Sequence, residues 1–466
     1  MRIIVSNEIT IEHPSQELKD WCKKTLVVKN PDFEKKFRMK LWLGDTPEKI
    51  WLYKVDGDSI ILPFGVLTAI LPMTEGANFE TRFPKKRKID YQCEVPLFDY
   101  QEPAVNALCE AKYGILQSKA GSGKTQMGIA LIAKLGVKTL WLTHTQDLLR
   151  QSFERAAQYM DSSLFGTITA GKVHIGKGIT FATVQTLAKQ DMTQYRDTWD
   201  CVIVDECHRV AGSPTTLTQF GKVISSLACP HKYGLSATVH RADGLTKSIF
   251  CYLGNIAYSV PDEAVADKVM QVTVLRRNTG IGISPKCLDT DGTLLYQDLI
   301  AYLSESYRRN YRIVNDLVEN ADHYNLILSD RLKHLETLMD MLPDEIQKDC
   351  VKIDGSMTTK KGRQQREQAI ADMREGKKHY LFASYKLAKE GLDIPRLDRL
   401  YLTTPQKDYA VIVQSVGRVA RTFKDKEPPL CYDYVDNIEY LINGFKKRCR
   451  HYKKCGCTIE EVTTNG

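Results

Sequence analysis

Residues 119–125 read Lys-Ala-Gly-Ser-Gly-Lys-Thr, and this stretch decides the fold. The apolar run Tyr113–Leu116 before it predicts a short buried strand, and residues 126–133 after it predict an amphipathic helix. Glycines between a strand and a helix N-terminus are typical of a phosphate-binding loop, because they turn tightly and point backbone N–H groups at phosphate oxygens. The loop departs from the full motif at Ser118, where glycine is usual. The alternative is a glycine-rich turn that precedes Lys-Thr by chance.

The loop suggests a role for each of its residues. Lys124 offers a cation to the β- and γ-phosphates, and Thr125 offers a hydroxyl to Mg²⁺. The remaining predicted phosphate ligands are the backbone groups of Ala120, Gly121, Ser122 and Gly123.

Length and composition indicate a soluble protein of several domains. The 466 residues exceed what one core supports, so about two to four domains are expected. No apolar run approaches the roughly 20 residues that cross a bilayer, and no signal peptide is recognisable, so we expect a cytoplasmic protein. The 13 cysteines include no C-x-x-C pair and indicate reduced core residues. A net charge of +8 is compatible with a polyanionic partner.

Residues 1–95 combine strand-like alternation of apolar and polar residues with a helix-like segment. This pattern predicts a small α+β accessory domain. Its basic residues are dense at Lys35, Lys36, Arg38 and Lys40. They form either a solvated face of a packing module or a grip on duplex or branched DNA.

From residue 96 to 265, strand and helix signals alternate, which predicts an α/β domain with a parallel sheet. Tyr100 and Gln101 precede the strand of the loop, and the glutamine amide can donate to and accept from an adenine edge. The buried strand at 201–204 ends in Asp205-Glu206-Cys207-His208. Buried carboxylates are costly unless they have a task, so we assign Asp205 to Mg²⁺ and Glu206 to polarising the attacking water.

Three further residues are interpreted as coupling residues. His208 follows the carboxylates without zinc-ligand spacing, and Ser236 and Thr238 belong to a Ser-Ala-Thr segment at a strand end. The hydroxyls of Ser236 and Thr238 could sense the γ-phosphate. The simpler alternative is that they cap the turn after the strand. Predicted phosphodiester contacts at other strand ends and turns are Thr143, Gln146, Gly171 and Thr183, with ordinary helix caps as the alternative.

The ordered set of Gln101, Gly-Ser-Gly-Lys-Thr, Asp-Glu-Cys-His and Ser-Ala-Thr resembles the DEAD/DEAH-box helicases and translocases of superfamily 2. The Asp-Glu-x-His form and the Arg-Ala-Asp-Gly at 241–244 look most like UvsW-like phage helicases, with XPB-like translocases as more distant relatives. The resemblance covers about residues 97–445. It implies two tandem RecA-like parallel-sheet domains behind the small α+β domain, with ATP and Mg²⁺ as cofactors.

The resemblance also requires a second RecA-like domain, which we expect at 266–448. Its segment at 389–393 places Gly391 and Asp393 nearest the ATP, and Gln-Ser-Val-Gly-Arg-Val-Ala-Arg ends in the arginine finger Arg421. Arg418 is interpreted as a second phosphate contact, and Gln414 as a catalytic-site residue of the same segment. Nucleic-acid contacts implied here are Ser329, Gly355 and Ser384, the last standing where many relatives carry threonine.

The C-terminal residues 449–466 are expected to form a basic tail. The basic, aromatic run from Phe445 to Lys454 is either an amphipathic helix lying on its own domain or a surface that binds a phosphate backbone.

The function expected is that of an ATP-dependent helicase or translocase acting on single-stranded, duplex or branched DNA, with RNA less favoured. The setting is a bacterial cell or a phage-infected host, in replication, recombination or repair. One alternative is the motor subunit of a restriction or defence complex, which translocates on duplex without unwinding it. Another is a nucleic-acid-binding protein whose affinity is switched by ATP. The sequence identifies no protein partner and is compatible with a monomer.

Overall fold

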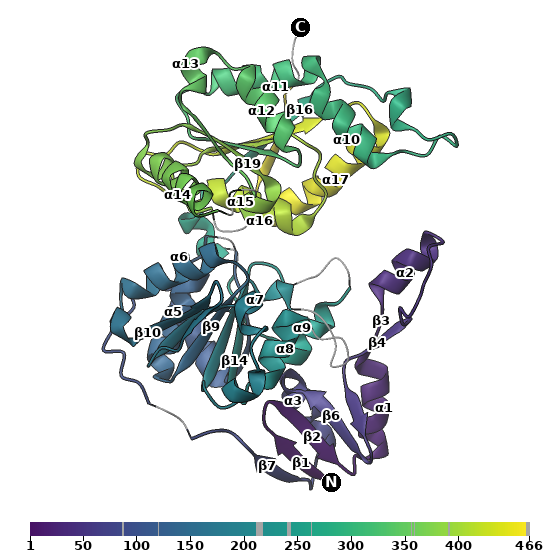
Figure 1. Ribbon diagram of the computed structural model, residues 1–466, viewed down its shortest axis with the longest axis vertical. Helices are drawn as coiled ribbons and strands as arrows, with labels where there is room; N and C mark the ends of the chain where they lie inside the picture. Colours follow the sequence, from purple (N-terminus) through teal and green to yellow (C-terminus); the bar gives the residue numbers. More distant parts are fainter. Residues whose placement is uncertain are drawn as a thin grey trace. The chain divides into compact units, whose positions relative to one another are not determined.

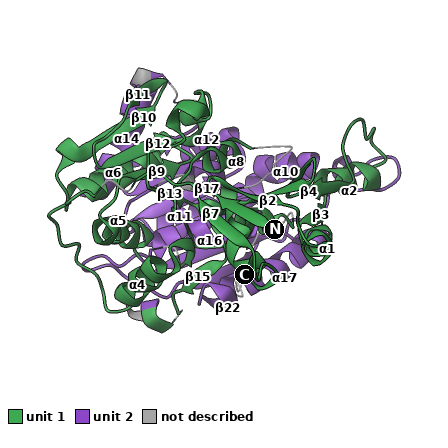
Figure 2. Ribbon diagram, turned by 90° about the horizontal axis from the view of Figure 1, so that it is seen from below, with its two compact units in different colours: residues 1–119, 123–264 green, residues 120–122, 265–466 purple. Residues whose placement is uncertain are grey.

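The computed structural model describes residues 1–85, 88–119, 121–210, 218–239, 244–261, 263–355, 357, 359–389 and 392–462. The chain divides into two compact units, coloured separately in Figure 2. Unit 1 comprises Met1–Lys119 and Gly123–Ala264, and unit 2 comprises Ala120–Ser122 and Val265–Gly466. Within the described ranges, none of the helices combines the length and apolar character needed to cross a membrane.

The core of unit 1 is an eight-stranded sheet in the order β11-β10-β12-β9-β13-β14-β8-β15. Its strands are β8 (Tyr113–Gln117), β9 (Thr139–Thr143), β10 (Phe165–Thr169), β11 (Lys172–His174), β12 (Ile179–Thr183), β13 (Cys201–Asp205), β14 (His231–Ser236) and β15 (Ile256–Ser259). Neighbouring strands are parallel except β10 and β11. The apolar runs of the sequence become these strands because a parallel sheet covered by helices buries both faces. The predicted α/β class is confirmed.

Helices cover the faces of this sheet (Figure 1). They are α4 (Gln101–Ala111), α5 (Lys124–Leu135), α6 (Gln146–Ala157), α7 (Val184–Leu187), α8 (Gln219–Ser226) and α9 (Thr246–Leu253). Gly128 allows α5 to approach the sheet closely, because a Cβ there would lie 2.7 Å from the Trp141 ring. This contact fixes the helix that begins at the phosphate-binding loop.

The N-terminal part of unit 1 is a five-stranded sheet in the order β5-β6-β2-β1-β7. The strands are β1 (Arg2–Val5), β2 (Glu8–Glu12), β5 (Lys54–Asp56), β6 (Ser59–Pro63) and β7 (Asn78–Thr81), accompanied by α1 (Gln16–Thr25) and α3 (Leu67–Ile70). Only the β1–β7 pair is parallel. This is the small α+β fold that the alternating pattern predicts.

The N-terminal sheet is attached to the larger sheet through buried contacts of Lys232. This β14 side chain donates to the carbonyl oxygens of Asn7 at 3.2 Å and Ile224 at 3.0 Å. Its ammonium lies 4.8 Å from the centre of the Phe64 ring, and burial lowers its pKa to about 8. Removing residues 1–95 would take away the Asn7 carbonyl and the Phe64 ring, which contact the buried Lys232 ammonium. The role of the N-terminal part is therefore better tested by single substitutions than by deletion.

Between α1 and β5 the chain leaves the N-terminal sheet as an arm, residues 27–51. The arm consists of β3 (Val27–Lys29), α2 (Pro31–Arg38) and β4 (Lys49–Trp51), and it stands out beside α1 in Figure 1. β3 and β4 pair antiparallel at its root.

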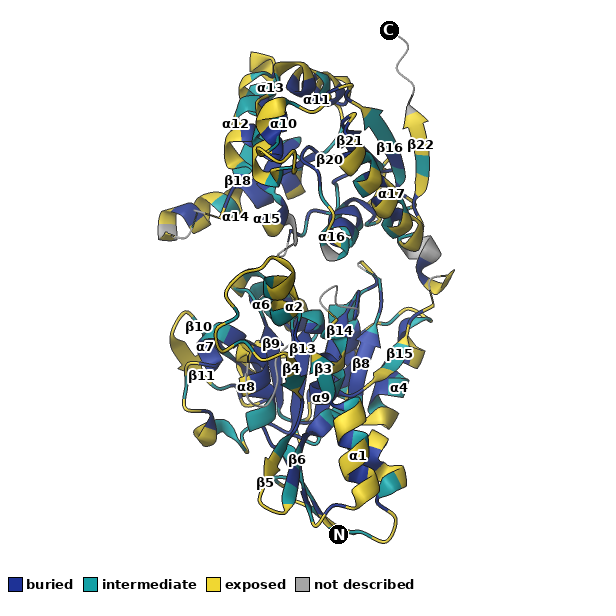
Figure 3. Cartoon of the chain, turned by 90° about the vertical axis from the view of Figure 1, so that its right-hand side faces the viewer, coloured by how far each residue is buried: buried dark blue, intermediate teal, exposed yellow. Residues whose placement is uncertain are grey.

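Unit 2 is built on a seven-stranded, fully parallel sheet in the order β18-β19-β17-β20-β21-β16-β22. The strands are β16 (Thr273–Asn278), β17 (Asn325–Ser329), β18 (Cys350–Ile353), β19 (Tyr380–Ser384), β20 (Arg399–Leu402), β21 (Leu430–Val435) and β22 (Thr458–Val462). The longer helices are α10 (Tyr296–Glu305), α11 (Tyr307–Glu319), α12 (Leu332–Asp340), α14 (Lys360–Glu375), α16 (Tyr409–Val419) and α17 (Glu439–Lys454), with α13 (Asp344–Gln347) and α15 (Tyr385–Lys389) short. Figure 3 shows the buried residues concentrated on the central strands of both units.

The segment expected as a basic tail, 449–466, contributes the last turns of α17 and the edge strand β22, which pairs with β16. Helix α17 lies on its own domain through buried residues that include Phe445 and Tyr452. Arg448 is also buried and forms a two-pronged pair with Asp433 at 2.7 and 2.8 Å. The basic side chains that remain exposed on this helix are Lys446, Lys447, Arg450, Lys453 and Lys454. Phosphate binding by this face stays a prediction.

A buried ion pair holds α11 to the end of β21. The Arg309 Nε donates to Asp436 at 2.8 Å, and both side chains are fully buried. We expect Arg309→Ala to lower the free energy of unfolding by about 3–5 kcal/mol, because it leaves the Asp436 carboxylate buried without its counter-ion. Urea unfolding of the full chain measures this. The adjacent exposed Arg308→Ala is the control and should change it by less than about 0.5 kcal/mol. Equal unfolding midpoints for both variants would contradict the prediction.

Candidate nucleotide and nucleic-acid sites

The loop between β8 and α5 has the backbone that phosphate binding needs. Gly121 and Gly123 adopt φ angles of +87° and +78°, a region that favours glycine. Helix α5 begins directly after Gly123, so the free N–H groups of its first turn point back into the loop. A Cβ at Gly123 would lie 2.4 Å from Nε2 of Gln101 and would close the cradle. Ala120, a predicted ligand, lies outside the described residues.

Gln101 lies against this loop, where the nucleotide prediction needs it. Its Oε1 accepts from the backbone N–H of Phe98 at 3.0 Å, and its Nε2 lies 3.4 Å from the Tyr100 hydroxyl. The rings of Phe98 and Tyr100 stack with centres 5.9 Å apart. The amide is therefore oriented beside a flat aromatic surface, as an adenine site requires. The adenine contact itself stays a prediction.

The Lys124 side chain folds over the loop from the first turn of α5. Its ammonium donates to the carbonyl oxygens of Ser118 at 3.3 Å and Lys119 at 3.2 Å. These are weak, exchangeable contacts to neutral groups, so the charge can move to a phosphate when one is present. Ser122 is buried within the loop, and Thr125 follows Lys124 on the helix.

The paired carboxylates end β13. Asp205 is only 6% exposed, and its carboxylate accepts from the backbone N–H of Glu206 at 3.0 Å. Burial, followed by the charge of Glu206, raises the Asp205 pKa above its usual range, while Lys124 opposes the rise. Glu206 has the left-handed backbone φ of +52°, which is uncommon for a residue with a side chain.

These residues suit a divalent cation. A buried carboxylate whose charged form is disfavoured gains most from a nearby cation, and Mg²⁺ prefers oxygen ligands. Asp205 and the Thr125 hydroxyl would hold the ion, which would neutralise charge on phosphate oxygens.

The predicted coupling residues meet beside the carboxylates. Strand β14 lies between β13 and β8, so the segments that follow all three strands meet at one sheet edge. Nδ1 of His208 is 3.2 Å from a Glu206 carboxylate oxygen and 3.2 Å from the Ser236 hydroxyl. That hydroxyl donates to the Thr238 carbonyl at 2.8 Å. A continuous polar path thus links Glu206 to Thr238. Residues 241–243 of the Arg-Ala-Asp-Gly segment lie outside the described ranges.

The predicted nucleic-acid residues of unit 1 are either threonines at strand ends or residues at a helix start and in a turn. Thr143 and Thr183 are register partners at the ends of β9 and β12, and both are buried. Their hydroxyls donate to protein atoms, Thr143 to the Thr145 carbonyl at 3.1 Å and Thr183 to the Thr186 hydroxyl at 3.0 Å. Gln146 starts α6, and Gly171 lies in the β10–β11 turn with open space around it. Contact with nucleic acid stays a prediction for all four.

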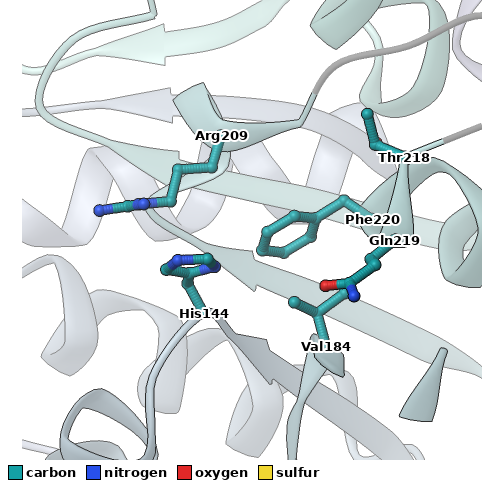
Figure 4. Close-up of a pocket in the computed structure, with 6 residues that line it drawn as sticks. All are labelled: His144, Val184, Arg209, Thr218, Gln219 and Phe220. Carbon is teal, nitrogen blue, oxygen red and sulfur yellow. The ribbon is translucent and has the colours of Figure 1, made fainter. Parts of the chain in front are cut away.

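Sequence reasoning missed a hollow of about 440 Å³ at the same sheet edge (Figure 4). It is lined by His144, Val184, Arg209, Thr218, Gln219 and Phe220. The rings of His144 and Phe220 stack with centres 6.3 Å apart. Gln185 holds His144, donating to its carbonyl at 2.6 Å. No local pattern could reveal this site, because Phe220 stands far from His144 in the sequence.

Unit 2 repeats the arrangement of strand ends. Ser329 and Ser384 are register partners at the ends of β17 and β19. The Ser329 hydroxyl is buried 3.1 Å from His334 Nδ1, and that of Ser384 accepts from the Leu387 N–H at 3.4 Å. Gly355, after β18, is exposed with open space at its Cα. Their nucleic-acid roles stay predictions.

The predicted nucleotide residues of unit 2 also converge. Arg421 forms an ion pair with Asp393, and Arg418 donates to the Leu392 carbonyl at 2.9 Å. Gln414 is buried on α16, and its Oε1 accepts no hydrogen bond from the described part of the chain. An unpaired buried acceptor is unusual and suits a site that a ligand completes. Gly391 lies outside the described residues.

Two protein-family models match the two units. The model described as "Type III restriction enzyme, res subunit" matches residues 94–241, and "Helicase conserved C-terminal domain" matches residues 309–423. The first match contains the loop and the carboxylates, and the second ends just after Arg421. The chain is a superfamily 2 helicase. The chain is accordingly an ATPase. Its two parallel-sheet domains are RecA-like.

Relatives of this helicase come from viruses, archaea and bacteria. A probable helicase of Escherichia phage T5 is 24% identical, over 93% of this chain and 90% of its own. A protein of Acanthamoeba polyphaga mimivirus, which carries the name of an ATP-dependent RNA helicase, is 28% identical over 77% of this chain and 67% of its own. The DNA 3′–5′ translocase XPB2 of Sulfurisphaera tokodaii is 31% identical over 38% of each chain.

Solved structures agree on the fold. Dbp5 of S. cerevisiae, in a complex with RNA and ADP BeF3, has a TM-score of 0.53 and 18% identity and covers 86% of this chain and 94% of its own. The helicase therefore has the RecA-like fold that its sequence predicts.

Proposed function

We propose that this helicase is a DNA motor that hydrolyses ATP to move on, or remodel, duplex and branched DNA. The observation that carries the proposal is the polar path from Glu206 through His208 to Ser236. Such a path connects the proposed place of γ-phosphate cleavage to Thr238 after β14, at the sheet edge that also carries the strand ends from which nucleic-acid contacts are predicted. Binding without base-specific contacts makes the motor indifferent to sequence.

The proposed chemistry assigns one task to each group. Lys124 stabilises charge on the β- and γ-phosphates, and Glu206 orients and polarises the attacking water. Thr125 and Asp205 hold Mg²⁺. Arg421, released from Asp393, and Arg418 stabilise the charge that develops during phosphoryl transfer. Gly391, Asp393, Gln414 and the Tyr100–Gln101 pair complete nucleotide binding, and Ser236 and Thr238 report the state of the γ-phosphate.

DNA is favoured over RNA as the partner. XPB2 is a DNA translocase, and the restriction-enzyme family that matches unit 1 acts in DNA restriction. The mimivirus relative supports RNA instead. The setting that fits the phage relative is the cytoplasm of an infected bacterium, in replication, recombination or repair.

The same restriction-family match favours a second candidate, a motor that translocates on duplex without separating strands. Two displacement assays separate the candidates. A helicase releases a strand from a forked duplex, whereas a pure translocase releases only the third strand of a triplex. Fork displacement driven by ATP supports the first candidate, and triplex displacement alone supports the second.

Glu206→Gln tests the catalytic assignment. It removes the carboxylate that polarises water but keeps the side-chain volume, so we expect ATP turnover to fall about 10²–10⁴-fold. Nucleotide affinity, measured with a fluorescent ATP analogue, should stay within about threefold, because Lys124 still binds phosphate.

The control is Glu154→Gln on α6, which removes an exposed carboxylate that pairs with Arg150 at 3.8 Å. It should leave turnover unchanged. Equal activity of the two variants would refute the role of Glu206.

A further inference from the structure

The arm carries apolar side chains that its own fold does not bury. At its root, Val27, Val28 and Ile50 pack against the core of the N-terminal sheet. Helix α2, by contrast, contains no buried residue. A helix of this size with no buried face gains little stability from packing, so its sequence is explained better by what it contacts than by its own core.

The tip of the arm, residues 35–42, alternates basic and apolar side chains. It reads Lys-Lys-Phe-Arg-Met-Lys-Leu-Trp, with four basic residues and no acidic one. Phe37 is 69% exposed and Trp42 87% exposed, and Met39 and Leu41 are exposed as well. Cations beside exposed aromatic rings complement a nucleic-acid strand, because the phosphates attract the charges and the bases stack on the rings.

Trp42 is the most exposed of the large apolar side chains that the structure describes. Its ring lies over Gly44, where a Cβ would come within 3.0 Å of the indole. Gly44 also adopts a φ of +51°. The indole therefore lies beside a glycine without a side chain, and its 87% exposure leaves the ring accessible for stacking.

The tip is anchored. Asn30 caps α2 by accepting from the Asp32 N–H at 3.0 Å, and its amide donates to the Pro47 carbonyl at 2.8 Å, which joins the two strands of the arm's root. Lys36 donates to the Thr46 hydroxyl at 2.6 Å across the loop. These bonds hold the tip in one shape, which lowers the entropy lost on binding.

We propose that the tip of the arm binds DNA at a branch point, with Trp42 and Phe37 stacking on unpaired bases and the lysines contacting the adjacent phosphates. The proposal rests on the proposed function, since it names the DNA feature that this motor recognises. Duplex alone offers no free base faces, so the tip discriminates forks from blunt duplex. Charge favours a nucleic acid over an apolar protein partner, because the tip carries four cations in eight residues.

Binding of the full-length protein to a forked DNA and to a blunt duplex, followed by fluorescence anisotropy at one fixed salt concentration, tests the proposal. We expect Trp42→Ala to raise the Kd for the fork about tenfold and the Kd for the duplex by less than about twofold. Trp42→Phe, which keeps an aromatic face, should stay within about threefold of wild type on the fork. The matched control Val55→Ala, at a 67% exposed apolar residue on β5 outside the arm, should change neither Kd.

A fork Kd that is unchanged in Trp42→Ala, or that rises equally in Trp42→Ala and Val55→Ala, would overturn the proposal. Thermal melting identifies a folding defect, and a variant with an altered melting temperature is replaced by Phe37→Ala, for which the same fork-selective loss is expected. The proposed function fails separately, if no DNA stimulates ATP turnover of the wild-type protein. If DNA stimulates turnover and the fork-to-duplex ratio of Kd is the same in wild type and variant, only the role of the arm fails.

Discussion

Replacing Lys124 with alanine is expected to lower DNA-stimulated ATP turnover by at least about 100-fold while the protein stays folded. The ammonium donates to the neutral carbonyl oxygens of Ser118 and Lys119. Hydrogen bonds of this kind add little to stability, so removal of the side chain leaves the protein folded but takes the nearest cation away from the γ-phosphate. Steady-state phosphate release measures turnover, and circular dichroism with thermal melting measures folding.

A matched control lies at the other end of the same helix. Lys134 donates to the Asn106 side chain and lies in the last turn of α5, at the opposite end of the helix from the loop. Lys134→Ala should keep wild-type turnover. Unchanged turnover in Lys124→Ala, or equal losses in both variants, would contradict the assignment of the loop.

Arg421→Ala is expected to have the larger effect on the chemical step, a fall of about 10³-fold in kcat. The guanidinium stabilises charge that develops only in the transition state, so nucleotide affinity should change far less than kcat. Arg421→Lys should restore little, because an ammonium lacks the planar two-pronged geometry. Single-turnover kinetics separate the chemical step from product release.

Asp393 provides the control for this prediction, because two arginines contact its carboxylate. Arg374 lies 3.6 Å from the second carboxylate oxygen and is partly exposed on α14. Arg374→Ala removes an equivalent cation from Asp393 and should leave kcat within about twofold. Equal effects of the two substitutions would show that Arg421 acts only by holding Asp393.

The two α/β units could be predicted from the sequence, and so could the edge of the unit 1 sheet at which the motifs of that unit lie. Asp205 and Ser236 each end a run of buried residues, and carboxyl ends of parallel strands always share one edge of the sheet. Local order was therefore enough to place the loop, the carboxylates and the Ser-Ala-Thr segment together.

The features that the sequence did not reveal depend on contacts between distant residues. Arg448 looked like one of several basic surface residues, but Asp433 on a neighbouring strand pairs with it in the interior. The hydrogen bond that the Thr143 hydroxyl donates to the Thr145 carbonyl at the start of α6 was likewise not visible in the sequence, and phosphate contact by Thr143 stays a prediction. The hollow beside His144 and the attachment of Lys232 to Asn7 also join segments far apart in the chain. Neither hydrophobic periodicity nor a local motif identifies contacts between residues that are far apart in the sequence.

The central claim is that DNA controls ATP hydrolysis by this protein. The most direct measurement compares steady-state ATP turnover without nucleic acid and with equal nucleotide concentrations of single-stranded DNA, blunt duplex, forked DNA and single-stranded RNA. We predict that at least one DNA form raises turnover about tenfold or more, that the fork is the best activator, and that RNA is a poorer one. Turnover that is the same in all five conditions would contradict the account.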